Sequence, residues 1–162
     1  MIRAILAHDK DWGIGKDGDL PWEKNPEDLK WFKECTKHSA VIMGRKTWES
    51  LPFKLPQRTN IVITSQFNYE WPKVPDNVFS AQIKQQIVNL NYELPVWIIG
   101  GAELVHSCLD IIDELWLNEV EGSYDCDTFL DKELITEKYS AEAVEEKDFG
   151  TITKWTLNEK LS

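Results

Sequence analysis

Two stretches of this sequence repeat one pattern, in which a short apolar run is followed by glycine and then by residues with helical spacing. The first spans residues 39–51 and contains SAVIM, then Gly44, then a predicted helix RKTWESL. The second spans residues 95–109 and contains PVWII, a pair of glycines and a predicted helix over 102–109. Short apolar runs that lead into helices are typical of buried strands in a parallel sheet. The pattern therefore predicts an α/β fold in which two helices begin at the carboxyl ends of neighbouring parallel strands.

The start of each of these predicted helices is a candidate binding site for phosphate. Backbone N–H groups in the first turn of a helix lack partners within the helix, and the helix dipole is positive at this end. Arg45 and Lys46 add positive charge to the first site. The first site taken alone is equally consistent with an ordinary turn that carries solvated basic residues. Two such sites on neighbouring strands favour a ligand that contains a diphosphate.

The remaining apolar runs complete one sheet. Buried strands are predicted at residues 2–7, 60–64 and 78–81, and residues 83–90 have helical spacing. After residue 113 the sequence changes to longer strand-like segments, and the three that we predict are 114–122, 137–145 and 151–158. The last two alternate polar and apolar residues around KDFG, which is typical of an antiparallel hairpin. One α/β sheet with helices on both faces accounts for the chain, and we expect residues 1–162 to form a single domain.

A helix is predicted to begin at Pro26, with Asn25 as its cap. Asparagine is a favoured helix cap, and proline is tolerated in the first helical position because its missing N–H group has no partner there anyway. The helix should run from residue 26 to about residue 36. At 100° per residue, Trp31 and Phe32 belong to one apolar arc of this helix.

Asp28 lies near the centre of that apolar arc, whereas Glu27 lies on the solvent side. Asp28 can simply serve the helix cap and the helix dipole, as acidic residues in a first turn often do. Glu27 already supplies this charge, however, and a dipole-serving acid has no reason to face Trp31 and Phe32. We therefore interpret Asp28 as a carboxylate that binds a cationic or amidine-like ligand or takes part in proton transfer.

The glycine-rich segment at residues 13–18, GIGKDG, matches the dinucleotide fingerprint of a Rossmann fold only in its spacing. That fingerprint requires a helix to begin at the glycines, but DLP follows at residues 19–21 and requires an extended or turning chain. A mobile loop between the first strand and the helix of Asp28 is the favoured interpretation. A loop in this place can act as a lid.

Composition limits the partners. The net charge of −10 argues against general binding to nucleic acid or to an anionic membrane, so the eight tryptophans are predicted to form core and pocket walls.

No apolar run approaches a membrane span, the N-terminal run is too short for a signal peptide, and we expect a cytoplasmic protein. Cys35, Cys108 and Cys126 lack the spacing of a metal site and are predicted to be reduced. In the absence of an exposed apolar stripe, a monomer is expected.

Several motifs occur together in the order and spacing of one known family. They are Gly13-Ile14-Gly15 through Leu20-Pro21-Trp22, Asp28 with Phe32, VIMGRKTWES at 41–50, Leu55-Pro56 with Arg58, Ile99-Gly100-Gly101 and CDTF at 126–129. On these motifs the sequence resembles the dihydrofolate reductases over essentially its full length. The resemblance implies an α/β domain with a mixed, mostly parallel eight-stranded sheet, an antiparallel C-terminal hairpin and helices on both faces.

The resemblance also implies an oxidoreductase that reduces 7,8-dihydrofolate to 5,6,7,8-tetrahydrofolate by hydride transfer from NADPH. Asp28 would bind N3 and the 2-amino group of the pterin and assist protonation of N5 through a water molecule. The 14–22 loop, which includes Trp22, would close over the nicotinamide, and Arg58 would bind the glutamate carboxylate of the substrate. The other implied substrate-binding residues are Ile5, Leu29, Phe32, Ser50, Leu51, Leu55, Ile99 and Asn118.

For NADPH, the resemblance implies residues for each part of the cofactor. Ala7, Ile14 and Thr47 would position the nicotinamide half, and the helices that begin at Gly44 and Gly101 would hold the diphosphate. The 2′-phosphate, which favours NADPH over NADH, would meet Arg45, Lys46 and Ser65 together with Thr64 and Gln66. The implied site is completed by Gly15, Ile99, Gly100, Ala102, Glu103 and Leu104, and the Gly100-Gly101 peptide resembles a cis peptide of the family.

Three positions depart from the family pattern. Asn118 stands where many members have threonine, Val105 where many have tyrosine, and Glu103 where an arginine is common. Two alternatives stay open, a pyrimidine or pterin reductase of the same fold and a non-catalytic module that binds folate, a nucleotide or a protein, and the three departures support only the second. The Leu20-Pro21-Trp22 segment that leads into the helix of Asp28 argues against the first alternative.

Overall fold

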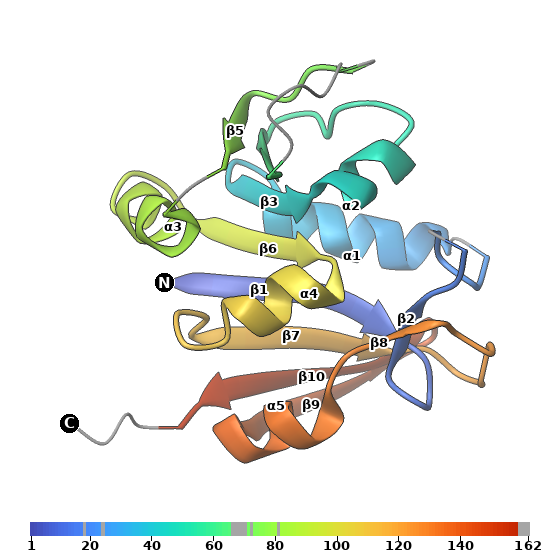
Figure 1. Ribbon diagram of the computed structural model, residues 1–162. Helices are drawn as coiled ribbons and strands as arrows, with labels where there is room; N and C mark the ends of the chain where they lie inside the picture. The colour runs from blue at the N-terminus through green and yellow to red at the C-terminus, as the bar shows by residue number, and fades with distance from the viewer. Residues whose placement is uncertain (18, 24, 66–70, 72, 81, 159–162) are drawn as a thin grey trace.

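The computed structural model describes residues 1–17, 19–23, 25–65, 71, 73–80 and 82–158 of the chain. Its main feature is an eight-stranded sheet with the order β5-β4-β3-β6-β1-β7-β10-β9 (Figure 1). These strands are β1 (Ile2–His8), β3 (Ala40–Gly44), β4 (Thr59–Ile63), β5 (Asn77–Phe79), β6 (Val96–Gly100), β7 (Glu114–Glu119), β9 (Tyr139–Lys147) and β10 (Gly150–Leu157). The first six strands of this order are parallel to one another, and β10 is antiparallel to both β7 and β9. The predicted mixed, mostly parallel sheet with an antiparallel C-terminal hairpin is confirmed.

Alternation along the strands divides the core into two halves. In β3, Ala40 and Ile42 belong to one apolar cluster, and Val41 and Met43 belong to the other. Successive side chains of a strand point to opposite faces, so each cluster covers one face of the sheet. The buried run SAVIM is therefore apolar throughout because both of its faces are covered.

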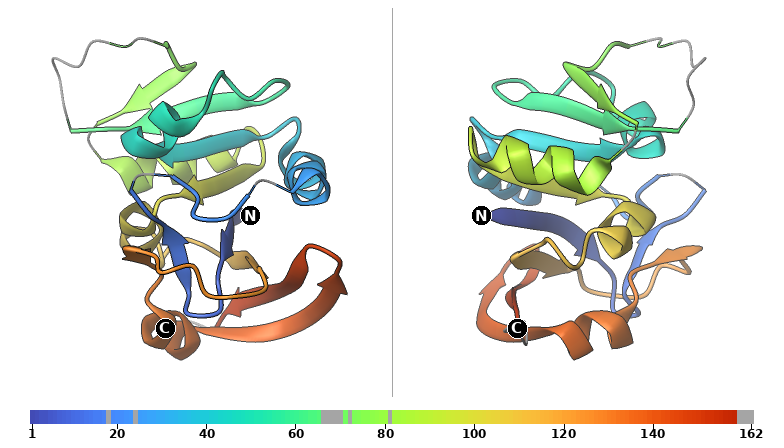
Figure 2. Two further views of the ribbon diagram at one scale, coloured as in Figure 1. Left: turned by 90° about the vertical axis from the view of Figure 1, so that its right-hand side faces the viewer. Right: turned by 60° about the vertical axis from the view of Figure 1, so that its left-hand side comes forward.

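Helices cover both faces, as expected. The cluster of Ala40 includes buried residues of α3 (Ile83–Asn91), α4 (Ala102–Ser107) and α5 (Lys132–Lys138). The cluster of Val41 includes Trp48 of α2 (Arg45–Ser50) and side chains of α1 (Pro26–Thr36). The views in Figure 2 show α1 on one side of the sheet and α4 on the other.

Some element boundaries differ from the predictions. The predicted strand 137–145 begins only at Tyr139, because residues 132–138 form α5, which the sequence analysis did not predict. The predicted strand 114–122 ends at Glu119, and the predicted helix 102–109 ends at Ser107. A second, two-stranded sheet formed by β2 (Gly13–Gly15) and β8 (Thr128–Phe129) was also not predicted. Ala81, the predicted end of one strand, lies outside the described residues.

Candidate active site

The helix of Asp28 has the predicted bounds and the predicted cap. The Asn25 side chain accepts a hydrogen bond from the Glu27 backbone N–H group at 2.9 Å, and Pro26 is the first helical residue. Asp28 is half-buried in the first turn of α1, whereas Glu27 is exposed. The two neighbouring carboxylates therefore have different environments, as the helical spacing predicted.

The Asp28 carboxylate is held by a residue from the middle of the sheet. The Asn118 side chain, which is fully buried in β7, donates a hydrogen bond from Nδ2 to Asp28 Oδ1 at 3.2 Å. Burial raises the pKa of Asp28 above its ordinary value, and the hydrogen bond from Asn118 acts in the opposite direction. Asn118 thus provides the polar link to Asp28 in spite of its departure from the family pattern.

Five of the predicted substrate-binding residues belong to one apolar cluster beside Asp28. Ile5 is buried within this cluster, and partly buried side chains from three other parts of the chain pack against it: Phe32, Leu51, Leu55 and Ile99. These residues come from β1, α1, the segment after α2 and β6. Together they form an apolar wall on one face of the sheet. Leu29 is exposed on α1, and the Ser50 hydroxyl donates to the Thr47 carbonyl at 2.7 Å.

Arg58 lies at the other end of α1, close to this wall. Its guanidinium carbon is 6.0 Å from the centroid of the Phe32 ring, and Nη1 donates a hydrogen bond to Thr36 Oγ1 at 3.1 Å. Nε donates to the Pro56 carbonyl at 2.9 Å, which fixes the plane of the group. Partial burial lowers the pKa of Arg58, but an arginine keeps its charge in proteins. The site therefore has a carboxylate in the first turn of α1 and a cation beside the helix end.

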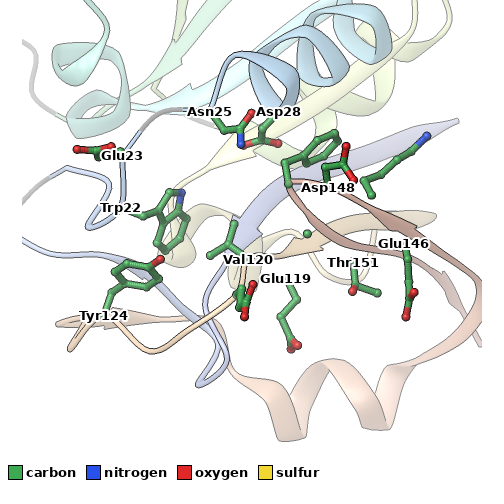
Figure 3. A pocket seen from close by; sticks show the side chains of 14 residues that line it. Trp22, Glu23, Asn25, Asp28, Glu119, Val120, Tyr124, Glu146, Asp148 and Thr151 are labelled. Atoms are coloured by element: carbon green, nitrogen blue, oxygen red, sulfur yellow. The ribbon is translucent and has the colours of Figure 1, made fainter.

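A cavity of about 710 Å³ opens next to Asp28 (Figure 3). Trp22 and Asn25 line it from the segment before α1, and the segments around Val120, Tyr124 and Phe149 also line it. The Trp22 and Tyr124 rings meet edge to face with centroids 5.6 Å apart. Six carboxylates line this cavity with one lysine, and they are Glu23, Asp28, Glu119, Glu121, Glu146 and Asp148, with Lys147.

The part of the cavity wall formed by Tyr124 and Phe149 was not predicted from the sequence. The Phe149 ring lies 6.2 Å from that of Trp31 in α1, so the turn between β9 and β10 also reaches this region. No local pattern identifies these residues, because each acts through contacts with a distant part of the chain. The predicted KDFG turn placed Phe149 between the last two strands. It did not indicate that the Phe149 ring would lie near Trp31 of α1.

On the cofactor side, the two glycine-helix units lie next to each other as predicted. β3 and β6 are parallel neighbours, and Met43 is aligned with Gly100. A Cβ atom at Gly100 or Gly101 would lie 3.6 or 3.9 Å from Thr47 Oγ1, so the start of α2 faces the start of α4. Gly44 and Gly101 are the residues that precede the two helices, and neither provides a side-chain cap. The Gly100-Gly101 peptide bond is cis, as the resemblance implied.

The predicted contacts to the 2′-phosphate lie at the same edge of the sheet. β3 and β4 are parallel, and Gly44 is aligned with Ile63, so Arg45 and Thr64 follow neighbouring strand ends. Arg45 Nη1 forms an ion pair with Glu49 Oε1 at 2.8 Å. Lys46 and Ser65 are exposed, and Thr64 is largely buried. Gln66 lies outside the described residues.

The other predicted cofactor-binding residues fall into two groups. Ala7 in β1 is aligned with Asn118 in β7, and Ile14 packs against the core from β2, where Gly15 is aligned with Thr128. At the start of α4, Ala102 and Leu104 are buried and Glu103 is exposed. Val105, the second departure on this helix, is fully buried.

The part of the chain that the structure describes has neither a cluster of metal ligands nor a helix that could span a membrane. No cluster of three or more histidine, cysteine or acidic side chains in this part of the chain has a geometry that could hold a metal ion. Within the same residues, none of the helices has the length and apolar character needed to cross a membrane.

Comparison with known proteins identifies the family. The sequence model of the family described as dihydrofolate reductase matches residues 1–157. The dihydrofolate reductase type 8 of Escherichia coli is 38% identical over 158 residues, which cover 93% of this chain and 92% of that protein. The bifunctional dihydrofolate reductase-thymidylate synthase of Glycine max is 36% identical over 146 residues, which cover 79% of this chain but only 27% of that protein.

A solved structure has the same fold over nearly the full chain. It is the dihydrofolate reductase from Enterococcus faecalis complexed with NADP(H) and RAB-propyl, which is 28% identical and aligns with a TM-score of 0.84. The alignment covers 98% of this chain and 97% of that one. The match of the family model over almost all of the sequence, the similarity to the E. coli protein and this shared fold agree with one another. The chain therefore belongs to the dihydrofolate reductase family.

Proposed function

We propose that this chain is an NADPH-dependent dihydrofolate reductase, which converts 7,8-dihydrofolate to 5,6,7,8-tetrahydrofolate. The observation that carries the proposal is the setting of Asp28, a half-buried carboxylate beside an apolar wall, held at 3.2 Å by the fully buried Asn118. The family membership supports the reaction, and the NADP(H) bound by the E. faecalis relative supports the choice of cofactor.

Asp28 binds and orients the pterin ring. An ionised carboxylate only accepts hydrogen bonds, and its two oxygens match two donors in one plane, such as N3–H and the 2-amino group of a pterin. Ile5, Phe32 and Ile99 shield this pair from water, together with Leu29, Leu51 and Leu55, and Ser50 completes the wall. Two bonds and a flat apolar wall leave the ring one orientation, so that the same atom of the substrate always faces the cofactor side.

Asp28 also assists protonation of N5. Burial raises the pKa of Asp28, so this pKa is closer to neutral pH than the pKa of an exposed aspartate. Such a pKa suits a group that takes part in proton transfer. The cavity beside Asp28 can hold water between this carboxylate and the segments around Trp22 and Tyr124. A water molecule at Asp28 delivers the proton to N5, and Trp22 positions this water.

Arg58 binds the opposite end of the substrate. Its Nη1 group and its fixed plane allow a bidentate pair with the glutamate carboxylate, the geometry that arginine favours. This interaction attracts an anionic substrate to a protein that is itself acidic. The distance between Asp28 and Arg58 along α1 then selects a long ligand with a cationic head and an anionic tail.

NADPH, when bound, supplies the hydride that C6 of the substrate receives. The sheet edge fits this cofactor, because Gly44, Gly100 and Gly101 leave room beside Thr47 and the uncapped first turns of α2 and α4 offer N–H groups to a diphosphate. The residues that would hold the nicotinamide half are Ala7, Ile14, Gly15, Thr47 and Ile99. Those that would hold the phosphates are Arg45, Lys46, Thr64, Ser65 and Gln66, with Ala102, Glu103 and Leu104 at the start of α4.

We extend the proposal to the setting of the protein in the cell. The chain would act in the cytoplasm as a monomer, with dihydrofolate as its small-molecule partner. The net charge of −10 supports the view that it binds neither nucleic acid nor an anionic membrane. Sedimentation of the purified protein would test the oligomeric state.

The function is tested by following NADPH-dependent loss of dihydrofolate absorbance with the purified chain. We expect turnover that needs both substrates, that is faster with NADPH than with NADH, and that is largely lost in Asp28→Asn. A non-catalytic module would instead bind dihydrofolate or NADPH, as measured by quenching of tryptophan fluorescence, without consuming either. That result would overturn the proposal and support the alternative class.

A further inference from the structure

A second buried carboxylate lies outside the chemistry described above. Asp9 follows β1 and is only 1% exposed. Its Oδ1 atom accepts hydrogen bonds from the backbone N–H groups of Asp11 at 2.9 Å and Gly13 at 2.8 Å. Its Oδ2 atom accepts from the Tyr124 N–H group at 3.0 Å and from the Cys126 thiol at 3.4 Å. Each oxygen of this carboxylate therefore accepts hydrogen bonds from a different segment. The two segments are far apart in sequence, with 117 positions between Asp9 and Cys126.

The two segments are also in close contact around Asp9. A Cβ atom at Gly13 would lie 2.4 Å from Cys126 Sγ, which is closer than any side chain allows, so glycine is required for this approach. The Asp127 N–H group donates to the Gly15 carbonyl at 2.9 Å, and the Asp17 N–H group donates to Asp127 Oδ2 at 2.9 Å. β2 pairs with β8 through only two aligned residue pairs. The buried Asp9 carboxylate binds the N–H group of Gly13, the first residue of β2.

The Asp9 carboxylate is ionised at neutral pH. Burial by itself would raise its pKa, but the N–H groups of Tyr124 and Gly13, with the Cys126 thiol and the Asp11 N–H group, bring the pKa below the ordinary value. Hydrogen bonds to an ionised acceptor are stronger than those between neutral groups. Burial, together with the contact with Asp9, raises the pKa of the Cys126 thiol to about 11, so the thiol keeps its proton and remains a donor.

We propose that Asp9 is a positioning residue for the reaction, which joins β2 to the 124–128 segment and thereby fixes Ile14 and Gly15 at the cofactor side of the site. The inference rests on the proposed function, since it assigns Asp9 a task in that same site. Asp9 is buried, and it acts through the backbone of Gly13. The 124–128 segment therefore contacts two parts of the site. It binds Asp9, and its Tyr124 ring also packs against Trp22 beside Asp28.

Replacement of Asp9 by asparagine would remove the acceptor for one of the two segments that Asp9 joins. Asparagine has the same shape, but only one of its two terminal atoms accepts hydrogen bonds. It can therefore satisfy either the donors of residues 11–13 or those of residues 124–126, and its NH₂ group must face the donors of the other segment. Asp125→Asn is the matched control, because Asp125 lies in the same segment, its side chain is almost fully exposed, and asparagine tolerates its positive φ of 53°.

The test compares the wild-type chain, Asp9→Asn, Cys126→Ala and Asp125→Asn by two measurements. The first is amide hydrogen exchange of Gly13 and of residues 15–17 in the protein without cofactor. The second is the rate of NADPH oxidation in a single turnover, at a temperature well below the melting temperature of each variant. We expect Asp9→Asn to accelerate the exchange and to slow the single turnover, each on the order of tenfold. Cys126→Ala, which removes one of the four donors, should give smaller changes in the same direction, and Asp125→Asn should give none.

A merely structural role would lower the melting temperature of Asp9→Asn and leave its single-turnover rate unchanged, and this outcome would overturn the proposal. If Asp9→Asn fails to fold, Cys126→Ala decides, because unchanged exchange and an unchanged rate in that variant would also contradict it. If the wild-type chain itself does not oxidise NADPH with dihydrofolate, the proposed function fails. The exchange measurement then still shows whether Asp9 holds β2, so the two failures are distinguishable.

Discussion

Asn118 Nδ2 donates a hydrogen bond to Asp28 Oδ1 at 3.2 Å, while the Oδ1 atom of the same amide is buried without a partner among the described residues. The space for this amide comes from Gly150, because a Cβ atom at Gly150 would lie 2.1 Å from Asn118 Oδ1. The amide therefore presents a donor to the carboxylate and leaves one acceptor unused. A buried acceptor of this kind is costly unless it finds a donor, so we expect a bound water or the ligand to supply one.

The first prediction concerns the identity of the functional carboxylate. Asp28→Asn should fold but lose most of its activity near neutral pH, because the amide cannot favour the protonated substrate. Activity should recover in part at low pH, where the substrate is already protonated. The matched control is Glu27→Gln, which changes the neighbouring exposed acid. Full activity of Asp28→Asn at pH 7, with loss in Glu27→Gln, would show that the wrong carboxylate had been chosen.

The second prediction follows from the same pKa and concerns stability. The folded state raises the pKa of Asp28, so the folded chain holds this proton at pH values where the unfolded chain has released it. Stability contributed by Asp28 is therefore lost as pH rises from the unfolded pKa through the folded one. Asp28→Asn removes this loss and should unfold at a higher denaturant concentration than the wild type at pH 7. The difference should shrink at acid pH, where both states bind the proton, and a destabilised variant at pH 7 would contradict this account.

The third prediction tests the role of Asn118. Asn118→Leu keeps the approximate volume of the side chain but removes the donor that stabilises ionised Asp28, so the pKa of Asp28 should rise further. The pH dependence of single-turnover reduction should then shift toward alkaline pH. Asn118→Thr keeps a hydroxyl donor and serves as the control, with a smaller shift. A profile that shifts toward acid in Asn118→Leu would mean that the amide presents its oxygen, not its nitrogen, to Asp28.

Local patterns were sufficient for the elements that build the reaction side of the site. The Asn25 cap, Pro26 and the apolar arc predicted α1 with its bounds, because each of these signals acts within one or two turns of a helix. The glycines after β3 and β6 likewise predicted two neighbouring helix starts. Both conclusions required only the spacing of residues that are close in sequence.

The contacts that join the two loop segments could not be predicted in this way. Asp9 meets Cys126 across 117 positions, and β2 pairs with β8 through only two aligned residue pairs. α5 was missed because Ile135 is its only buried residue, so the helix has almost no apolar periodicity, although Asp131 caps it by accepting from the Leu134 N–H group at 3.0 Å. The setting of Gly150 beside Asn118 also depends on the register of β10 against β7.

The fourth prediction concerns the 2′-phosphate. Replacing both Arg45 and Lys46 by alanine should weaken NADPH binding much more than NADH binding. A charge-assisted hydrogen bond to phosphate contributes about 1.5–3 kcal/mol, so the loss for NADPH should be roughly tenfold to more than a hundredfold. The control replaces Lys30 and Lys33, two exposed residues of α1, and has the same change in net charge. Equal weakening of both cofactors would place the phosphate contact elsewhere.

The fifth prediction is that diaminopyrimidine or diaminopteridine inhibitors compete with dihydrofolate and depend on Asp28. Their protonated N1 and 2-amino group present two donors in one plane, and a carboxylate is the one side chain that accepts both while carrying the opposite charge. Beside Ile5, Phe32 and Ile99 this pair is shielded from water, so it should stabilise the complex more than an exposed ion pair would. The apparent pKa of the inhibitor should therefore be higher in the complex than in solution. Titration of its ultraviolet spectrum measures both values, with Asp28→Asn as the variant in which the difference should disappear. A bound pKa equal to or below the free one would exclude Asp28 as the ionised partner.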